Sequence, residues 1–388
     1  MASKYRNKVK VGSGTFGDVY RAEVKKTGEV VAIKTIKLTG KSDGVEISAI
    51  DEIKIMQELR HPNIVRLYEV YQSKGQVSMV MDFLPTDLEI LIKANDFSKR
   101  YVEMPAEDIK AYMKMLLEGI NCCHKNFVLH RDLKPGNLLI SPDGVLKIAD
   151  FGLARTYGSP NARYSHQAIT LWYRPLELLL GAQHYGPSCD MWGVGCIFAE
   201  MLLRVPLFAG DSEVHQCHQI VSCMGIPTEE NWPGFKELKL SLSFKPVAKT
   251  PLSKVIPAAK RDAIDLLEQL LTYDPNKRVS AEQALKHPYL TSAPEPSTHD
   301  KIAQRIRELE ALKAAEKKAK GEQLPESVEA APMPKPKSLG SQFVKIEAEA
   351  EPEPEAKPPA PKAEGDDEDN TAGKKRKRLR AVESPSYG

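Results

Sequence analysis

With 388 residues, 41% of them hydrophobic, the chain has room for two or three domains with a full core. Its formal net charge of +3 excludes a strong overall bias towards nucleic acid or membranes, and neither is an expected partner. The six cysteines lack a C-x-x-C spacing, which disfavours a disulfide framework or a zinc site, and no apolar stretch approaches the roughly 18 residues of a membrane span.

The first 80 residues show short apolar runs separated by turn residues, with one helical stretch at about 47–59. Strands are expected at Lys8–Val11, Val19–Val24, Val30–Lys37, Val65–Tyr71 and Val77–Met81. From residue 86 onward the apolar spacing becomes helical. Helices are expected at Ala106–Asn121, Cys189–Leu203, Ser212–Met224, Arg261–Thr272 and Ala281–Leu285. This order predicts an α+β fold with a small β-rich lobe, a larger α-helical lobe and an active site at their junction.

The composition changes near residue 295. Ile302, Ile306, Leu309 and Leu312 recur at helical spacing, which predicts an amphipathic helix that packs on the chain's own core, with a partner surface as the alternative. In residues 321–388, Leu, Ile, Val and Phe number only eight of 68, which predicts a disordered tail with an acidic block at 347–369. The predicted domains are 1–84, 85–295, 296–320 and 321–388.

A basic run, Lys374–Arg380, follows the acidic block of the tail. Such a run is typical of a nuclear import signal, although a run that only balances the acidic block would look the same. We therefore expect the protein in the nucleus, with the cytoplasm as a further location.

The segment 12–19 has the pattern G-x-G-x-x-G-x-V, with glycines at Gly12, Gly14 and Gly17. A glycine backbone allows a phosphate group to approach closely, where a Cβ would collide. A dinucleotide-binding fold uses a similar pattern but needs a helix after it, whereas Val19–Val24 is typical of a strand. The pattern therefore predicts a β-loop-β cover over phosphates, with an ordinary hairpin as the alternative.

One lysine, Lys34, lies in a strand that is otherwise apolar, Val31-Ala32-Ile33-Lys34. A buried ammonium group needs an anion. Glu52, on the helical stretch 47–59, is the expected partner, and phosphate oxygens are another candidate.

The decisive segments are His130–Ile140, with the pattern H-R-D-L-x-x-x-N, and Asp150-Phe151-Gly152. Phosphoryl transfer needs magnesium to neutralise the phosphates and a carboxylate to orient the attacking hydroxyl. Asp132 is the expected carboxylate, with Lys134 beside the transferred charge. Asn137 and Asp150 supply the oxygen ligands that magnesium prefers.

These segments form the protein-kinase signature, and residues 8–290 resemble a eukaryotic protein kinase. Ser48–Ile53 is similar to the cyclin-facing helix of the cyclin-dependent kinases, and Thr170–Arg174 is similar to the run after their activation segment. Within that family the chain most resembles the CDK-activating kinases, which also occur in general transcription factor IIH. The stretches that carry this resemblance are Pro85–Lys93, Lys110–Met113, Gly158–Asn161 and Leu202–Pro206.

The resemblance implies a bilobal kinase that transfers phosphate from ATP, with Mg²⁺, to serine or threonine. The expected substrates are Ser/Thr-Pro sites, the activation segments of other cyclin-dependent kinases and the RNA polymerase II C-terminal repeat. The expected partners are a cyclin-H-like cyclin, an assembly factor and transcription factor IIH. The alternatives are a cell-cycle or other transcriptional cyclin-dependent kinase, and a non-catalytic scaffold that binds a cyclin.

Carried over residue by residue, the resemblance implies that backbone groups of Asp82 and Leu84 contact adenine. The side chains expected to sandwich the adenine ring are those of Val11, Val19, Ala32 and Leu139. Asp190 is expected to hold the catalytic loop. Glu177 and Arg278 are expected to form the ion pair that anchors the end of the activation segment.

The chain departs from the family in the activation segment, where A-P-E is replaced by Pro175-Leu176-Glu177. Because proline fixes φ at a different residue here, the wall that accepts the residue after the phosphoacceptor is expected to change shape. Ser165 takes the place of the activating phosphothreonine, and Ser159 is a second candidate.

Three arginines bind the activating phosphate in relatives. Arg131 and Arg155 match two of them, whereas Asp51 takes the place of the third. We expect a weaker dependence on phosphorylation, unless Asp51 turns outward to solvent or to a cyclin lysine. We also expect the helix at 47–59 to need a cyclin to hold Glu52 within reach of Lys34, because nothing else in the sequence fixes it.

Overall fold

The computed structural model describes residues 4–14, 17–37, 47–73, 75–94, 104–158, 169–238 and 249–319, which all belong to one compact unit. The predicted tail, 321–388, and the two candidate phosphosites, Ser159 and Ser165, lie outside these residues. Among the helices of the described ranges, none combines the length and the apolar character needed to cross a membrane.

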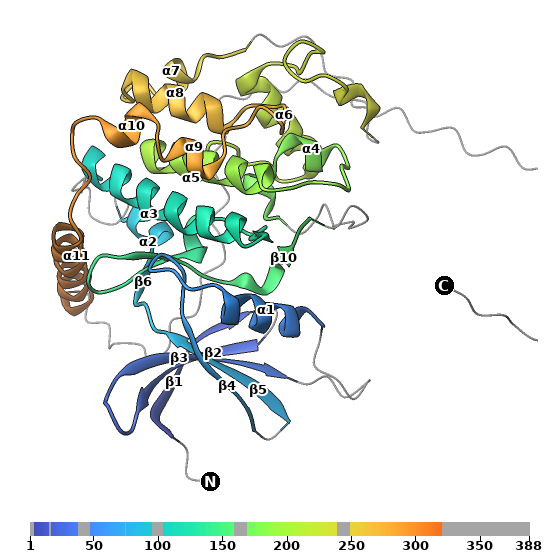
Figure 1. Ribbon diagram of the computed structural model, residues 1–388. Helices are drawn as coiled ribbons and strands as arrows, with labels where there is room; N and C mark the ends of the chain where they lie inside the picture. The colour runs from blue at the N-terminus through green and yellow to red at the C-terminus, as the bar shows by residue number, and fades with distance from the viewer. Residues whose placement is uncertain are drawn as a thin grey trace, which may run out of the picture. The chain divides into compact units, whose positions relative to one another are not determined.

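The N-terminal part is an antiparallel sheet with the strand order β1-β2-β3-β5-β4, drawn in blue in Figure 1. Its strands are β1 (Tyr5–Gly14), β2 (Gly17–Val24), β3 (Val30–Lys37), β4 (Leu67–Ser73) and β5 (Gln76–Asp82). All five predicted strands are confirmed, with shifted ends. Alternation along β3 puts Val31 and Ile33 in one apolar cluster with Tyr5, and turns Lys34 to the opposite face.

Helix α1 (Ile47–Glu58) packs beside this sheet (Figure 1). Its buried positions are Ala49, Glu52, Ile55 and Met56, and Leu59 follows directly after the helix. The spacing of three and four residues makes one apolar stripe along the helix, because such positions share a face. Glu52 is the charged member of the stripe, so it must meet a cation inside the fold.

The C-terminal part is mainly helical, as predicted. Its longer helices are α3 (Ala106–Lys125), α5 (Ser188–Leu203), α6 (Glu213–Met224), α8 (Arg261–Leu270) and α11 (His299–Ala319). Its short helices are α2 (Leu88–Lys93), α4 (Leu176–Leu179), α7 (Leu252–Val255), α9 (Ala281–Ala284) and α10 (Pro288–Thr291). Single 3₁₀ turns are η1 (Pro135–Asn137), η2 (Phe151–Leu153), η4 (Leu171–Tyr173) and η5 (Phe235–Glu237).

This part also contains short strands that were not predicted from the sequence. They are β6 (Thr86–Asp87), β7 (Val128–Leu129), β8 (Leu138–Ile140), β9 (Leu146–Ile148) and β10 (Arg155–Thr156). Strands of two or three residues are too short to show an alternating pattern. They matter because β8 directly follows Asn137 of the predicted catalytic loop, and β9, which pairs with β8, ends just before Asp150.

Helix α5 lies at the centre of the helical part, with residues Cys189–Met201 buried on every side. Trp192 stacks near Phe208 and Tyr273, and the guanidinium of Arg278 lies over its ring. A helix that is apolar all round needs neighbours all round, so α5 is the support on which the catalytic loop rests.

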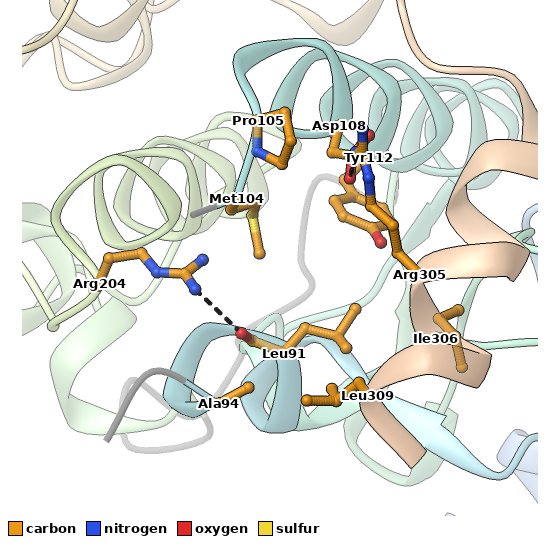
Figure 2. Close-up of a pocket in the computed structure, with 10 residues that line it drawn as sticks. All are labelled: Leu91, Ala94, Met104, Pro105, Asp108, Tyr112, Arg204, Arg305, Ile306 and Leu309. Carbon is orange, nitrogen blue, oxygen red and sulfur yellow. Dashed lines mark hydrogen bonds and ion pairs between the residues drawn. The ribbon is translucent and has the colours of Figure 1, made fainter. Parts of the chain in front are cut away.

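The predicted amphipathic helix after residue 295 is α11, and it packs on the chain's own core through Ile302 and Ile306. The apolar face of α11 is therefore covered by the chain itself at Ile302 and Ile306, whereas Leu312 is half exposed. A small cavity of about 50 Å³ lies between α2, α3 and α11, where Arg305 pairs with Asp108 (Figure 2). None of its lining residues is a predicted site residue.

Candidate active site

A cleft of about 780 Å³ lies where the sheet meets the helical part. It collects most of the predicted nucleotide, magnesium and catalytic residues. Those that line it are Val11, Gly12, Gly17, Val19, Ala32, Lys34, Glu52, Asp82, Leu84, Asp132, Lys134, Asn137, Leu139 and Asp150. Gly14 is described only through its backbone pairing, and the tip that follows it, residues 15–16, lies outside the described chain.

The glycine pattern forms a hairpin between β1 and β2, with Gly14 opposite Gly17. This is the predicted β-loop-β arrangement, and the dinucleotide alternative is excluded because a strand follows the loop. Gly17 has φ of +145°, and a Cβ there would lie 1.8 Å from the carbonyl oxygen of Thr35. Only glycine fits this position, so Gly17 fixes the loop against β3.

Lys34 forms the predicted ion pair with Glu52. Its Nζ lies 2.7 Å from Glu52 Oε1 and 3.4 Å from Asp150 Oδ1. Burial alone would lower the pKa of Lys34, but the two carboxylates outweigh it and hold that pKa above its ordinary value. The charged ammonium therefore joins the sheet, α1 and the start of η2 at one point inside the cleft.

Asp132 lies at the centre of the catalytic loop, and both of its carboxylate oxygens are engaged. Oδ2 accepts hydrogen bonds from Lys134 Nζ at 2.8 Å and from Asn137 Nδ2 at 2.9 Å. Oδ1 accepts a hydrogen bond from the hydroxyl of Thr170 at 2.5 Å. Thr170 was not predicted to join the site, because it follows Asp132 by 38 residues and no local pattern connects the two.

Asp190 on α5 holds the catalytic loop through hydrogen bonds to its backbone, as the resemblance implies. Its carboxylate accepts hydrogen bonds from the backbone N–H groups of His130 and Arg131, at 3.0 and 2.9 Å, and contacts His124 Nε2 at 2.9 Å. Complete burial would raise the pKa of Asp190, but these donors hold it below its ordinary value. The loop needs this anchor because Arg131 has a left-handed φ of +66°.

Asn137 and Asp150 offer the oxygens expected for magnesium. The carboxylate of Asp150 is nearly half exposed in the cleft, while Asn137 is buried beside Asp132. Within the described ranges, no group of three or more His, Cys, Asp or Glu side chains gathers as a metal site. Magnesium fits this arrangement, because it usually takes one or two protein oxygens and completes its shell with phosphate and water.

The comparisons agree with this geometry. Residues 5–290 match the protein kinase domain family. The chain is 49% identical over 293 residues to cyclin-dependent kinase 7 of Dictyostelium discoideum, covering 74% of this chain and 80% of that one. It belongs to the cyclin-dependent protein kinases. It is 46% identical over 315 residues to cyclin-dependent kinase 7 of Xenopus laevis, covering 80% and 88%.

A solved structure is similar as well. It is the CAK complex of Chaetomium thermophilum bound to ATP-gamma-S, at 41% identity and a TM-score of 0.71, covering 76% of this chain and 94% of that chain. The kinase therefore transfers phosphate from ATP, with magnesium, to serine or threonine. Magnesium held by Asn137 and Asp150 would neutralise the phosphates. Asp132 and Lys134 are the side chains predicted to orient the hydroxyl and to lie beside the transferred charge. A scaffold without activity would have no need for these contacts.

The end of the activation segment keeps its predicted anchor despite the displaced proline. Arg278 donates to Glu177 Oε1 at 2.8 Å and to Oε2 at 3.1 Å, and both side chains are buried. Pro175 is the N-cap residue of α4, where a missing N–H costs no helical hydrogen bond. The kinase therefore tolerates Pro175-Leu176-Glu177, because Glu177 still lies in the first turn of α4 and reaches Arg278.

The predicted phosphate-binding corner consists of Arg131, Arg155 and Asp51, and Asp51 is a residue of α1. Arg131 Nε donates to the Leu153 carbonyl at 2.7 Å, and its Nη1 donates to the Tyr185 hydroxyl at 3.1 Å. Arg155 Nε lies 3.9 Å from Asp51 Oδ2, and both side chains are about one-third exposed. Asp51 therefore does not turn away to solvent, because it faces an arginine of its own chain.

The structure shows the arrangement of α1 that a cyclin was expected to hold. Glu52 lies within reach of Lys34, with a contact of 2.7 Å, and the need for a cyclin stays a prediction. The buried stripe of α1 and the added contact of Lys34 with Asp150 hold the helix in place. A pattern of apolar residues did not reveal that Asp150 takes part in this contact.

Proposed function

We propose that this kinase is a CDK-activating kinase, which phosphorylates the activation segments of other cyclin-dependent kinases and the C-terminal repeat of RNA polymerase II. The observation that carries the proposal is the similarity to the CAK complex, which extends over 94% of that chain. The relatives named cyclin-dependent kinase 7 support the same assignment. Its partners are a cyclin-H-like cyclin, an assembly factor and transcription factor IIH.

The contacts of Arg174 support a preference for proline after the phosphoacceptor. Its Nη2 and Nε donate to the carbonyl oxygen of Ile169 at 2.8 and 3.1 Å, beside Thr170 in the cleft. That oxygen is therefore not available to a substrate N–H, and a substrate amide placed there would lose a hydrogen bond. Proline has no N–H to satisfy, so Ser/Thr-Pro substrates lose nothing.

The test is a comparison of substrates with the full chain and a cyclin-H-like partner. We expect phosphorylation of a cyclin-dependent kinase with an unphosphorylated activation segment and of a C-terminal repeat peptide, and phosphorylation at least about 10²-fold slower with Asp132→Asn. Replacing the proline of the repeat peptide by alanine should lower kcat/KM for the peptide. Phosphorylation of other Ser-Pro peptides, but not of activation segments, would instead identify a cell-cycle or other transcriptional kinase.

The partners require a separate test. The native protein, purified by a tag, should bring down a cyclin with either an assembly factor or subunits of transcription factor IIH. Recovery with a cell-cycle cyclin alone would contradict the proposal and favour the alternative.

We also propose a nuclear location, with the cytoplasm as a second one, which rests on the basic run Lys374–Arg380 alone. Replacing its lysines and arginines by glutamine should move a fluorescent fusion out of the nucleus. An unchanged distribution would mean that the run only balances the acidic block at 347–369.

A further inference from the structure

The carboxylate of Asp82 gathers three hydrogen-bond donors at the end of β5, where the sheet passes into the helical part. Its Oδ2 accepts from Lys147 Nζ at 2.7 Å and from the backbone N–H of Arg66 at 3.0 Å. Its Oδ1 accepts from the hydroxyl of Tyr68 at 2.5 Å. Asp82 is expected to contact adenine through its backbone only, so its side chain has no assigned function.

The donors come from both parts of the kinase. Arg66 lies directly before β4 and Tyr68 lies within it, so both belong to the sheet, whereas Lys147 is on β9 of the helical part. The side chains of Asp82 and Lys147 are 13% and 21% exposed. Because the pair is shielded from water, its attraction exceeds that of a surface ion pair. One carboxylate therefore ties the two parts together beside the cleft.

The tie lies close to both ends of the nucleotide site. Asp82 precedes the backbone expected to contact adenine, and Lys147 precedes Asp150, the expected magnesium ligand, by three residues. In between, Ile148 donates from its backbone N–H to the Asn63 carbonyl at 2.9 Å, which joins β9 to the sheet side. A change at the carboxylate would therefore alter the spacing between the adenine end and the magnesium end.

The electrostatics keep this carboxylate ionised. Burial would raise the pKa of Asp82, but the hydrogen bonds from Lys147, Tyr68 and the Arg66 N–H outweigh it, and the pKa lies below its ordinary value. The lysine thus faces a full negative charge throughout the neutral pH range. Charge-assisted contacts of this kind are stronger than neutral ones and have a more definite geometry.

We propose that Asp82 is a positioning residue for the nucleotide, and that its contact with Lys147 fixes the distance between the adenine-contacting backbone and Asp150. The inference rests on ATP binding in the cleft and does not depend on the cyclin or the substrates proposed above. A carboxylate that only held the fold together would lower stability without changing nucleotide affinity in the folded protein.

The experiment compares Asp82→Asn, Lys147→Met and the double variant in the full chain. Binding of a fluorescent ATP analogue to the chain without partners gives a readout apart from activity, and urea unfolding without nucleotide reports the fold. We expect each single variant to weaken nucleotide binding about tenfold, and KM for ATP to rise equally. At saturating ATP, kcat should fall less than about threefold, because Asp132 keeps its own contacts.

The double variant should lose no more than either single variant, because both changes remove the same contact. Asp82→Glu keeps the charge and should recover part of the affinity. Lys286→Met is the matched control, because Lys286 forms an exposed pair with Glu282 away from the cleft. It should leave nucleotide affinity within about twofold of the parent.

Three outcomes would overturn the proposal. The first is unchanged nucleotide affinity in a folded Asp82→Asn protein, and the second is additive losses in the double variant. The third is tighter nucleotide binding, which would mean that the tie opposes ATP. If Asp82→Asn does not fold, Lys147→Met decides alone, because unchanged affinity there contradicts the same contact. Failure of the CDK-activating assignment would leave all these binding measurements interpretable.

Discussion

The catalytic loop and the phosphate-binding corner lie on either side of Arg131, yet they are built differently. In the loop, Asp132 is buried and receives hydrogen bonds of 2.5 to 2.9 Å from three side chains. In the corner, the Asp51 and Arg155 side chains are one-third exposed and 3.9 Å apart. Short buried hydrogen bonds hold the Asp132 side chain in one orientation, whereas the long exposed pair of Asp51 and Arg155 can exchange partners at low cost. The geometry around Asp132 is therefore fixed within the chain, while the contacts of Arg155 can change when a phosphate binds.

The largest effect is expected at the centre of the catalytic loop. Asp132→Asn keeps the size of the side chain but removes the charge that orients the attacking hydroxyl, so kcat should fall by about 10² to 10⁴-fold. Nucleotide affinity, measured with a fluorescent ATP analogue, should stay within about threefold, because Asp150 and Lys34 are unchanged. Asp211→Asn, on an exposed side chain, is the control. Equal activity of parent and Asp132→Asn would contradict the assignment of Asp132.

The second effect concerns stability at the buried end of the activation segment. Arg278→Met leaves Glu177 as an uncompensated buried charge, which should lower the free energy of unfolding by about 3–5 kcal/mol. The exposed pair of Lys286 and Glu282 makes the matched comparison, and Lys286→Met should cost less than about 0.5 kcal/mol. Urea unfolding measures both. Similar losses in the two variants would show that burial does not set the cost.

The third effect tests how far the kinase depends on a cyclin. A partner that binds the arrangement in which Lys34 contacts Glu52 would raise the population of that arrangement. An increase in activity of at least about tenfold needs only about 1.4 kcal/mol of differential binding. The measurement is kcat/KM on a peptide with and without a cyclin-H-like partner. Full activity of the chain alone would contradict this expectation.

The sequence predicted the parts of this kinase that follow local rules. Alternating apolar residues revealed the five strands of the sheet, and the spacing of Ile302 and Ile306 revealed the packing side of α11. Most of the residues that line the cleft could be predicted, because the lysine strand, the catalytic loop and the Asp150 turn each have a recognisable pattern.

Contacts between distant residues were not predictable in the same way. Thr170 reaches Asp132 across 38 residues, and Lys147 reaches Asp82 across 65, without any pattern that connects them. Both depend on how two elements pack, and packing is a property of the whole fold. Where this chain differs from its relatives, as at Asp51, the sequence shows the change of charge. Only the structure shows that Arg155 is the partner of that charge.

The smallest and most specific effect is expected at the corner itself. A phosphate on Ser165 carries a charge of about −1.5 to −2 and needs cations to order the activation segment. Arg155 already lies near Asp51, so a phosphate that binds Arg155 must compete with a carboxylate of the same chain. We therefore expect Ser165→Ala to cost the cyclin-bound kinase less than about tenfold in kcat/KM.

Asp51→Arg sharpens this test, because it removes the competing carboxylate and adds a cation beside Arg155. In that background, the same Ser165→Ala change should cost more than it does in the parent. Asp51→Asn is the matched control, because it removes the charge without adding a cation, and its effect should lie between the two. An abolished activity in the Ser165→Ala parent, or an equal cost in all three backgrounds, would mean that Asp51 does not compete with the phosphate for Arg155. The graded order expected here follows from the charge at position 51 alone, so it separates competition at Arg155 from any loss of fold.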